Sequence, residues 1–166
     1  MRILLGFFFL TFCYSSVKAL EVNDQAVSCP ANLESENTQL DLQKYQGKVI
    51  YLDFWATWCP PCKKSMPYLN ALRNEFLDQG FEIIAISVDE NPEIARQFLQ
   101  QHPVDYLIAM DPGGQCPKEY DVQAMPSAFF IDRKGKIRYI HLGFRDSDKE
   151  EIRNRVIELI TENDVE

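Results

Sequence analysis

Hydrophobic residues fall into two kinds of segment that alternate along this chain. Near-continuous apolar runs at 48–55 and 81–88 suit strands that are buried on both faces of a sheet. After each run, apolar residues recur at spacings of three and four, which predicts helices over 60–79 and 91–101. Strands that alternate with helices predict an α/β layered sheet.

Proline and glycine mark the ends of the first of these helices. Pro60 and Pro61 fit a first turn, where a missing backbone N–H is harmless, and Gly80 ends the helix. Pro67 lies about two turns in, and we expect it to kink the helix.

Shorter elements follow in the second half of the chain. We expect a strand over 105–110, a turn over 111–114, a helical piece over 115–120, strands over 127–132 and 136–142, and a last helix from 147 to about 160. Gly135 marks a hairpin between the last two strands, and Ser147 with Glu150 predicts a capping box at the start of the last helix. A closing hairpin after βα units implies a mixed strand order.

Residues 20–46 are weakly patterned. We expect a small hairpin from 29–33 and 38–40, a turn between them at 34–37, and a short helical turn that Asp41 caps and that ends near Gly47. The length of 166 residues suits one domain with a real core. We therefore assign 20–166 to a single domain with an N-terminal extension at 20–46.

Residues 1–19 have the pattern of a secretory signal peptide. Arg2 precedes an uncharged apolar run at 3–14, and Val17-Lys18-Ala19 offers small residues for cleavage. The run is shorter than the ~20 residues that span a bilayer, so an uncleaved membrane anchor is the alternative. We expect an exported, periplasmic protein, which contacts a membrane only if this segment is retained.

Charge and cysteine content narrow the class further. Loss of Arg2 and Lys18 with the signal leaves 15 basic and 25 acidic residues, a formal net charge of −10. Such a chain is poorly suited to nucleic acid or an anionic membrane surface. Four cysteines remain in a compartment where disulfides persist: Cys29, Cys59, Cys62 and Cys116.

Cys59 and Cys62 form a CxxC motif where a predicted strand ends and a helix begins. A helix N-terminus carries partial positive charge and free N–H groups, which favour the thiolate of Cys59. Cys62, one turn later, can resolve a mixed disulfide, and the intervening prolines set the relative stability of dithiol and disulfide. We therefore predict thiol–disulfide exchange, with Cys59 attacking and Cys62 resolving. Lys63 and Lys64 either add positive potential there or form a solvated helix face.

Asp53 interrupts the first apolar run, six residues before Cys59. Burial of a carboxylate is costly unless it is paired or protonated. Asp53 either reaches water at a strand end or is a buried proton acceptor under the dithiol, and we favour the second interpretation.

A CxxC pair also occurs in other kinds of site. Half of a zinc site would need more ligands, and only His102 and His141 are available, far apart in the sequence. A copper-binding pair, an inert disulfide and a peroxidatic cysteine are further alternatives. We expect no metal and no cofactor.

The stretch DFWATWCPPCK at 53–63 resembles the active-site strand and helix of thioredoxins. Pro67, Met125-Pro126 before a late strand, Gly143 and the amphipathic last helix extend the likeness, which covers roughly 47–160. The N-terminal hairpin, the signal and the extra helix and strand at 91–110 resemble the TlpA-like subgroup, exported reductases of which many serve cytochrome c maturation. The resemblance implies a thioredoxin-like α/β fold with a central mixed sheet flanked by helices, an N-terminal hairpin and a helix–strand insertion.

The resemblance also implies roles for individual residues. It implies that Met125-Pro126 is a cis peptide bond beside Cys59, in a loop that can pair with a substrate strand. It places Trp58, Pro60, Pro61, Met125 and Pro126 at the substrate-binding surface, with Trp55 and Trp58 as an aromatic pair around the site. Asp53 matches the buried acid that helps deprotonate the resolving cysteine.

Ser65 is a departure from the pattern. Cytochrome-maturation members often carry an acidic residue three positions past the second cysteine, and this chain has a serine there. Dedication to apocytochrome c is therefore not implied. Cys29 and Cys116 lie outside the motif, and either a second disulfide or two free thiols fits the sequence.

The function we expect is reduction of disulfides in exported proteins, with electrons from a membrane-bound donor. A disulfide oxidase or isomerase with the same fold is the nearest alternative, and a thiol-based metal-binding or chaperone module is an alternative from another class. We expect a monomer.

Overall fold

One seven-stranded mixed sheet forms the centre of the protein. The computed structural model describes residues 20–35 and 38–162. The strands, in the order in which they lie side by side, are β2 (Thr38–Gln39), β1 (Asn32–Leu33), β5 (Leu107–Met110), β4 (Phe81–Ser87), β3 (Val49–Trp55), β6 (Ser127–Ile131) and β7 (Ile137–Leu142). β3 is central: it pairs parallel with β4 and antiparallel with β6. The predicted mixed order is confirmed.

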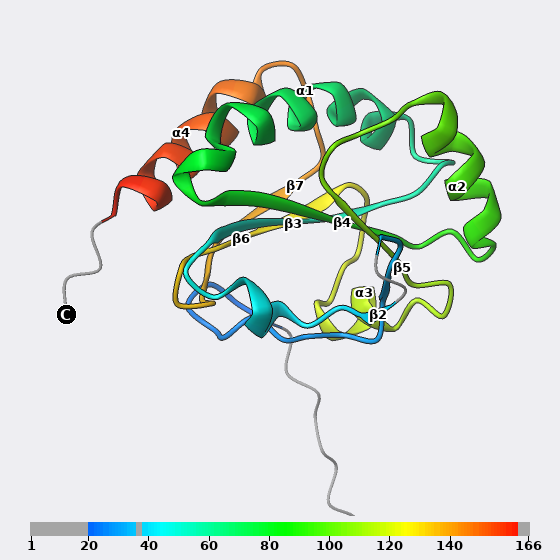
Figure 1. Ribbon diagram of the computed structural model, residues 1–166, viewed down its shortest axis with the longest axis horizontal. Helices are drawn as coiled ribbons and strands as arrows, with labels where there is room; N and C mark the ends of the chain where they lie inside the picture. Colours follow the sequence, from blue (N-terminus) through cyan, green and yellow to red (C-terminus); the bar gives the residue numbers. More distant parts are fainter. Residues whose placement is uncertain (1–19, 36–37, 163–166) are drawn as a thin grey trace, which may run out of the picture.

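Helices cover both faces of this sheet. α1 (Pro60–Phe76), α2 (Pro92–Gln101) and α4 (Asp148–Thr161) lie on one side, while α3 (Gln115–Glu119) and the N-terminal extension lie on the other (Figure 1). The short 3-10 turns η1 (Leu42–Tyr45) and η2 (Leu77–Gln79) complete the elements. Gly80 ends η2 with φ +83°, as the sequence predicted.

The two faces of β3 belong to two separate cores. Val49, Tyr51 and Trp55 pack toward α1 and α4, and the alternate residues Ile50, Leu52 and Phe54 pack toward α3 and the extension. This division follows from the period-two alternation of side chains along a strand. All seven residues of β3 are buried, as the continuous apolar run predicted.

The N-terminal extension closes the second core. β1 pairs antiparallel with β2 and with β5, and the Asp41 carboxylate accepts the backbone N–H of Gln43 at the start of η1. Cys29 and Cys116 form a buried disulfide that joins the extension to α3. The predicted hairpin is therefore confirmed. Of the two alternatives for Cys29 and Cys116, the structure has the disulfide and not two free thiols. The predicted signal at 1–19 and two residues of the hairpin turn lie outside the described residues.

The predicted capping box at Ser147 is wrong. Ser147 already has helical dihedral angles (φ −64°, ψ −22°), and its hydroxyl donates to Asp148 Oδ1 instead of accepting a backbone N–H. Asp148 Oδ2 accepts the N–H of Arg145 at 2.7 Å, and Asp148 N donates to Arg145 O. A turn over 145–148 therefore starts the helix, and the competing carboxylate next to Ser147 occupies its hydroxyl.

Glu82 is a buried acid in β4 that depends on one partner. Its carboxylate accepts two N–H bonds from Arg73 of α1, at 2.9 and 3.0 Å, and one from the backbone of Ile83. This fork fixes α1 on the sheet at the end remote from Cys59.

We expect Arg73→Leu to lower the free energy of unfolding by about 3 kcal/mol, because it leaves a buried carboxylate without its counter-charge. Urea unfolding at pH 7 measures the effect. Lys64→Leu is the matched control: it removes an exposed ion pair with Asp146 and should leave stability almost unchanged. Equal losses in the two variants would contradict the assignment of Glu82 as a buried charge held by Arg73.

Candidate active site

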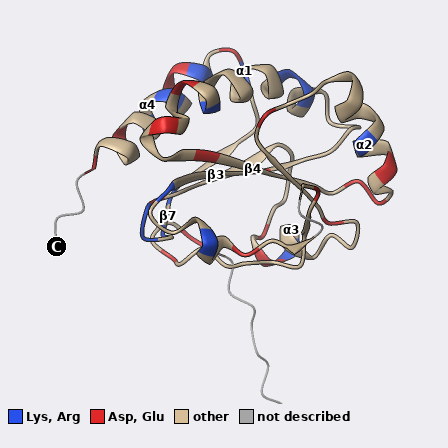
Figure 2. Cartoon of the chain, viewed as in Figure 1, with Lys and Arg blue, Asp and Glu red and all other residues tan. Residues whose placement is uncertain are grey.

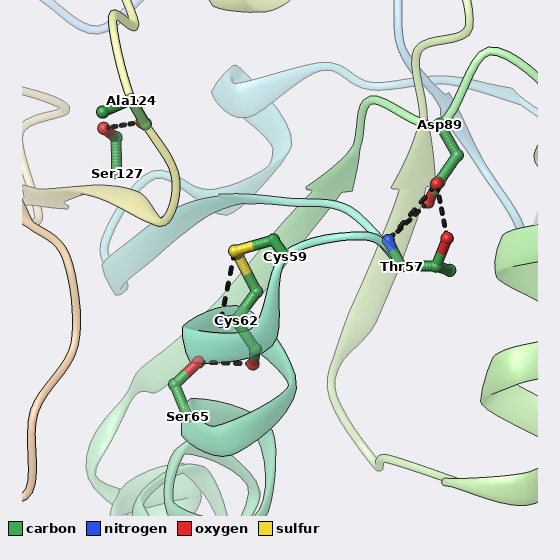
Figure 3. The surroundings of a disulfide bond; sticks show 7 residues. All are labelled: Thr57, Cys59, Cys62, Ser65, Asp89, Ala124 and Ser127. Atoms are coloured by element: carbon green, nitrogen blue, oxygen red, sulfur yellow. Dashed lines mark hydrogen bonds between the residues drawn. A yellow bond between two sulfur atoms is a disulfide. The ribbon is translucent and has the colours of Figure 1, made fainter.

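Cys59 and Cys62 lie at the N-terminus of α1, directly after β3. Cys59 is the N-cap residue, Pro60 and Pro61 form the first turn, and the two sulfurs are joined in a disulfide. The Cys62 N–H donates to Cys59 Sγ at 3.2 Å (Figure 3). In the dithiol form this N–H and the helix dipole favour a thiolate at Cys59.

The two cysteines differ slightly in their exposure to solvent. Cys62 is 0 % exposed, whereas Cys59 keeps 4 % of its surface. An incoming disulfide therefore meets Cys59 first, and Cys62 is placed to attack from within the protein. This geometry supports the roles that the sequence predicted for the two cysteines.

A buried acid that the sequence reasoning missed anchors the loop before Cys59. Asp89 follows β4, and its carboxylate accepts the Thr57 N–H at 3.0 and 3.2 Å and the Thr57 hydroxyl at 2.7 Å (Figure 3). The Ser87 hydroxyl donates to the same carboxylate at 2.9 Å. Because β3 and β4 are parallel neighbours, their carboxyl ends meet at this edge. An acid just after a buried strand was the signal that could have identified Asp89.

Replacing Asp89 with alanine should lower the free energy of unfolding by about 2 kcal/mol, since several donors at 57 and 87 lose their acceptor. It should also slow thiol–disulfide exchange at Cys59, because the loop over 56–58 is no longer held in place. Denaturant unfolding and stopped-flow exchange with a small disulfide measure the two effects. Thr57→Val removes only one of the side-chain bonds and should have the smaller effect on both, and the reverse order would contradict this role for Asp89.

Asp53 is buried in β3, on the face of the sheet that α1 covers. It lies two residues from Tyr51 and from Trp55, and therefore on the same face of the strand as these two residues, which belong to the same core as both cysteines. Burial raises the pKa of Asp53 to about 8. The pKa values of Tyr51 and Tyr106 are raised by burial and, to a smaller extent, by the Asp53 carboxylate. Asp53 therefore carries a proton at neutral pH, and it is a buried acid rather than one that reaches water at a strand end.

The cis peptide bond between Met125 and Pro126 is present. Ser127, the next residue, pairs with Phe54, so Pro126 lies level with the end of β3 that leads to Cys59. Two hydrogen bonds hold this loop: Ser127 Oγ donates to Ala124 O at 2.6 Å (Figure 3), and Gly143 N donates to Pro126 O at 2.8 Å. Met125 packs against the core that contains both cysteines.

The remaining predicted surface residues divide into exposed and buried ones. Trp58 is 65 % exposed beside Cys59, Pro60 is exposed, and Pro61 is half-buried. Trp55, by contrast, is fully buried against Phe98, with ring centroids 5.8 Å apart. The expected aromatic pair is therefore split into one surface residue and one core residue. Leu142, which sequence reasoning did not select, is exposed, and it pairs with Ser127, the residue after Pro126.

The residues that follow Cys62 differ in their surroundings. Ser65 is buried, and its hydroxyl donates to Cys62 O at 2.8 Å, so it brings no charge to the site. Lys64 pairs with Asp146 at 2.5 Å, and the Lys63 ammonium lies 5.8 Å from the centre of the Phe98 ring. Both lysines are exposed.

Two further observations concern metals and membranes. Within 20–35 and 38–162, no three His, Cys, Asp or Glu residues come together as a metal site. His102 stacks on Phe98 at the end of α2, and His141 lies in β7, 3.7 Å from Asp148. None of the helices in this part of the chain is long and apolar enough for a membrane span.

Comparison with known proteins agrees with this site. The Redoxin family model matches residues 21–156. The chain is 34 % identical over 132 residues to the thiol-disulfide oxidoreductase ResA of Bacillus cereus, covering 80 % of this chain and 76 % of the relative. It is also 34 % identical over 104 residues to ResA of Bacillus subtilis, covering 63 % and 58 %.

A solved structure gives the same result for the fold. A Chlorobium tepidum protein, described as the thiol:disulfide interchange protein DsbE, superposes with a TM-score of 0.82 at 36 % identity, covering 86 % of this chain and 99 % of that one. The predicted thioredoxin-like fold is thereby confirmed. The chain belongs to the Redoxin family, within the TlpA-like part of the thioredoxin superfamily, and is a thiol-disulfide oxidoreductase.

Proposed function

We propose that the protein is an exported reductase that reduces disulfides in periplasmic proteins through Cys59 and Cys62. The observation that carries this proposal is the difference between the two cysteines: Cys59 keeps 4 % of its surface exposed, whereas Cys62 keeps none. A dithiol of this geometry can attack a partner's disulfide and then release the partner without a second protein.

The reaction needs only groups that the chain supplies. The Cys59 thiolate attacks one sulfur of the substrate disulfide, the S–S bond breaks, and the other substrate sulfur leaves as a thiolate. The Cys62 thiol gives its proton to the ionised form of Asp53, which is the minority form at neutral pH because burial raises the pKa of Asp53 to about 8. The Cys62 sulfur then attacks Cys59 and breaks the bond between Cys59 and the substrate. The substrate leaves as a dithiol, and the enzyme keeps the Cys59–Cys62 disulfide.

The partners in this proposal are disulfide-containing exported proteins and a membrane-bound electron donor that restores the dithiol. The chain acts as a monomer, without metal or cofactor, after removal of the signal at 1–19. A retained anchor would place the same domain at the membrane surface. A role in cytochrome c maturation rests on the TlpA-like resemblance, and the uncharged Ser65 gives it no independent support.

The direction of electron flow is tested by the reduction potential of the Cys59–Cys62 pair. A reductase should have a potential near that of thioredoxin, about −270 mV, because its dithiol must be the less stable form. Titration against glutathione and dithiothreitol buffers measures it. A potential near −120 mV would instead identify a disulfide oxidase. A 1:1 complex with a metal ion, with no reduction of insulin, would favour the binding module.

A further inference from the structure

A small apolar pocket lies between α1 and α2, and Lys63, the residue after Cys62, is one of the residues that line it. Its volume is about 310 Å³, enough for one large side chain. Met66, Pro67, Phe98 and Val104 supply apolar walls, and Lys63 and His102 lie at its rim. In Figure 1 the beginning of α1 is the part nearest α2, so the pocket is on the dithiol side of the molecule.

The Phe98 ring is a fixed wall of this pocket. His102 stacks on it with centroids 4.4 Å apart and an interplanar angle of 12°, and Trp55 supports it from the core at 5.8 Å. His102 Nδ1 also lies 3.2 Å from Phe98 O. The pocket is therefore preformed in the structure, and filling it would cost little ordering of its walls.

Lys63 is the cation at the mouth of the pocket, and no carboxylate of residues 20–35 or 38–162 pairs with it. Within α1, α2 and α4, every other lysine or arginine is paired with an acid: Lys64 with Asp146, Arg73 with Glu82, Arg96 with Glu34, Lys149 with Asp146, Arg153 with Glu75 and Arg155 with Glu158. The contact of Lys63 is the face of Phe98, at 5.8 Å. Lys63 thus brings a positive charge to an apolar pocket in a chain of net charge −8. Figure 2 shows the acidic and basic residues along α1, α2 and α4.

Beside Asn70, which also lines the pocket, the polarity is the opposite. Asp105 follows Val104, and its carboxylate accepts the side-chain N–H groups of Asn70 and Asn74 on α1, at 3.0 and 2.7 Å. An anionic group on a ligand is therefore favoured at the Lys63 end and disfavoured at the Asp105 end. This asymmetry gives a bound segment a direction.

We propose that this pocket receives an apolar side chain of the substrate protein and that Lys63 pairs with an acidic residue next to it. Pocket residues 63–67 lie four to eight positions after Cys59, about 6–12 Å along the helix. An extended substrate covers that distance in about two to four residues from its cysteine. The inference deepens the proposed function, on which it rests, by naming the substrate class: disulfides flanked by an acidic and apolar segment.

The test uses four capped peptides whose single cysteine is joined to thionitrobenzoate. Each peptide carries a different pair of residues, which begins three positions from the cysteine: Leu-Glu, Leu-Lys, Ser-Glu or Ser-Lys. Attack by Cys59 of the reduced protein releases thionitrobenzoate, and Cys62 then releases the peptide thiol, so absorbance gives a rate constant for each peptide.

The wild type should favour Leu over Ser by roughly tenfold, from burial of the side chain, and Glu over Lys by about threefold. Lys63→Gln should abolish the Glu preference and keep the Leu preference. Lys64→Gln, the matched control, removes the same charge one position later and should keep both. Val104→Trp fills the pocket and should remove the Leu preference. Ratios between peptides within one variant cancel any change in thiolate reactivity.

Two results would overturn the inference: equal rates for all four peptides with the wild type, or loss of the Glu preference in Lys64→Gln as well as in Lys63→Gln. Failure of the proposed function looks different: a potential near −120 mV would identify an oxidase and leave the peptide ratios unchanged, whereas an inert disulfide would react with none of the peptides and would not reduce insulin. For an unreactive protein, fluorescence anisotropy of labelled peptides with serine in place of cysteine tests whether the pocket binds the leucine side chain. Binding that depends on leucine and Lys63 supports it, and no such dependence refutes it.

Discussion

Replacing Cys62 with serine should abolish turnover and leave Cys59 joined to its substrate in a mixed disulfide. Cys62 is completely enclosed and one helical turn from Cys59, so no other cysteine of the described chain can take its place; Cys29 and Cys116 are held in their own buried disulfide. Without the resolving thiol, the complex persists until an external thiol attacks it. Insulin reduction measures the loss, and mass spectrometry of species trapped in cells identifies the partners.

Cys59→Ser is the matched control for this experiment. It should be equally inactive and should trap nothing, because Cys62 has no exposed surface from which to meet a substrate. Equal trapping by the two variants would reverse the assigned roles. The trapped proteins also test the proposed location: a set made up of cytosolic proteins would contradict an exported reductase, and apocytochrome c among them would support a role in its maturation.

Elements with strong local signals were predictable from the sequence. The continuous apolar run gave β3 its position, and Pro60, Pro61 and Gly80 bounded the helical segment that contains α1 and η2. The cis bond before Pro126 came from the resemblance, because most X–Pro bonds are trans and local sequence does not distinguish them. Ser147 failed as a cap because a neighbouring carboxylate competed for its hydroxyl.

Contacts that depend on tertiary structure were not predictable. Asp89 reaches Thr57 only because β3 and β4 are parallel neighbours that end at one edge, and the two residues are 32 positions apart. Cys29 and Cys116, 87 positions apart, are brought together by the packing of the extension on α3. The pocket beside Lys63 likewise requires the packing of α2 against α1, whereas Cys59, Cys62 and Asp53 were predicted because one local motif contains all three.

Replacing Asp53 with asparagine should stabilise the protein at neutral pH. Burial holds the pKa of Asp53 at about 8, against an ordinary value of 3.8. Below about pH 4 the carboxyl is protonated in both the folded and the unfolded chain and has no effect on stability. Between about pH 4 and 8 the unfolded chain releases this proton and the folded one keeps it, so stability falls as the pH rises. At pH 7 the cost is about 4 kcal/mol, and asparagine, which does not ionise, should recover it.

Urea unfolding of the oxidised protein at pH 4 and pH 7 measures this gain, which should be present at pH 7 and absent at pH 4. Asp146→Asn, which changes an exposed acid, is the control and should show no gain in stability at either pH.

Asp53→Asn should also slow disulfide exchange, because Cys62 loses its buried proton acceptor. Wild-type exchange should accelerate as the pH rises through about 8, where Asp53 ionises, and the Asp53→Asn profile should lack that step. A stability gain without any change in this profile would make Asp53 a buried acid with no part in proton transfer, whereas a stability gain together with loss of the step near pH 8 means that the carboxyl whose burial costs stability also accepts the Cys62 proton.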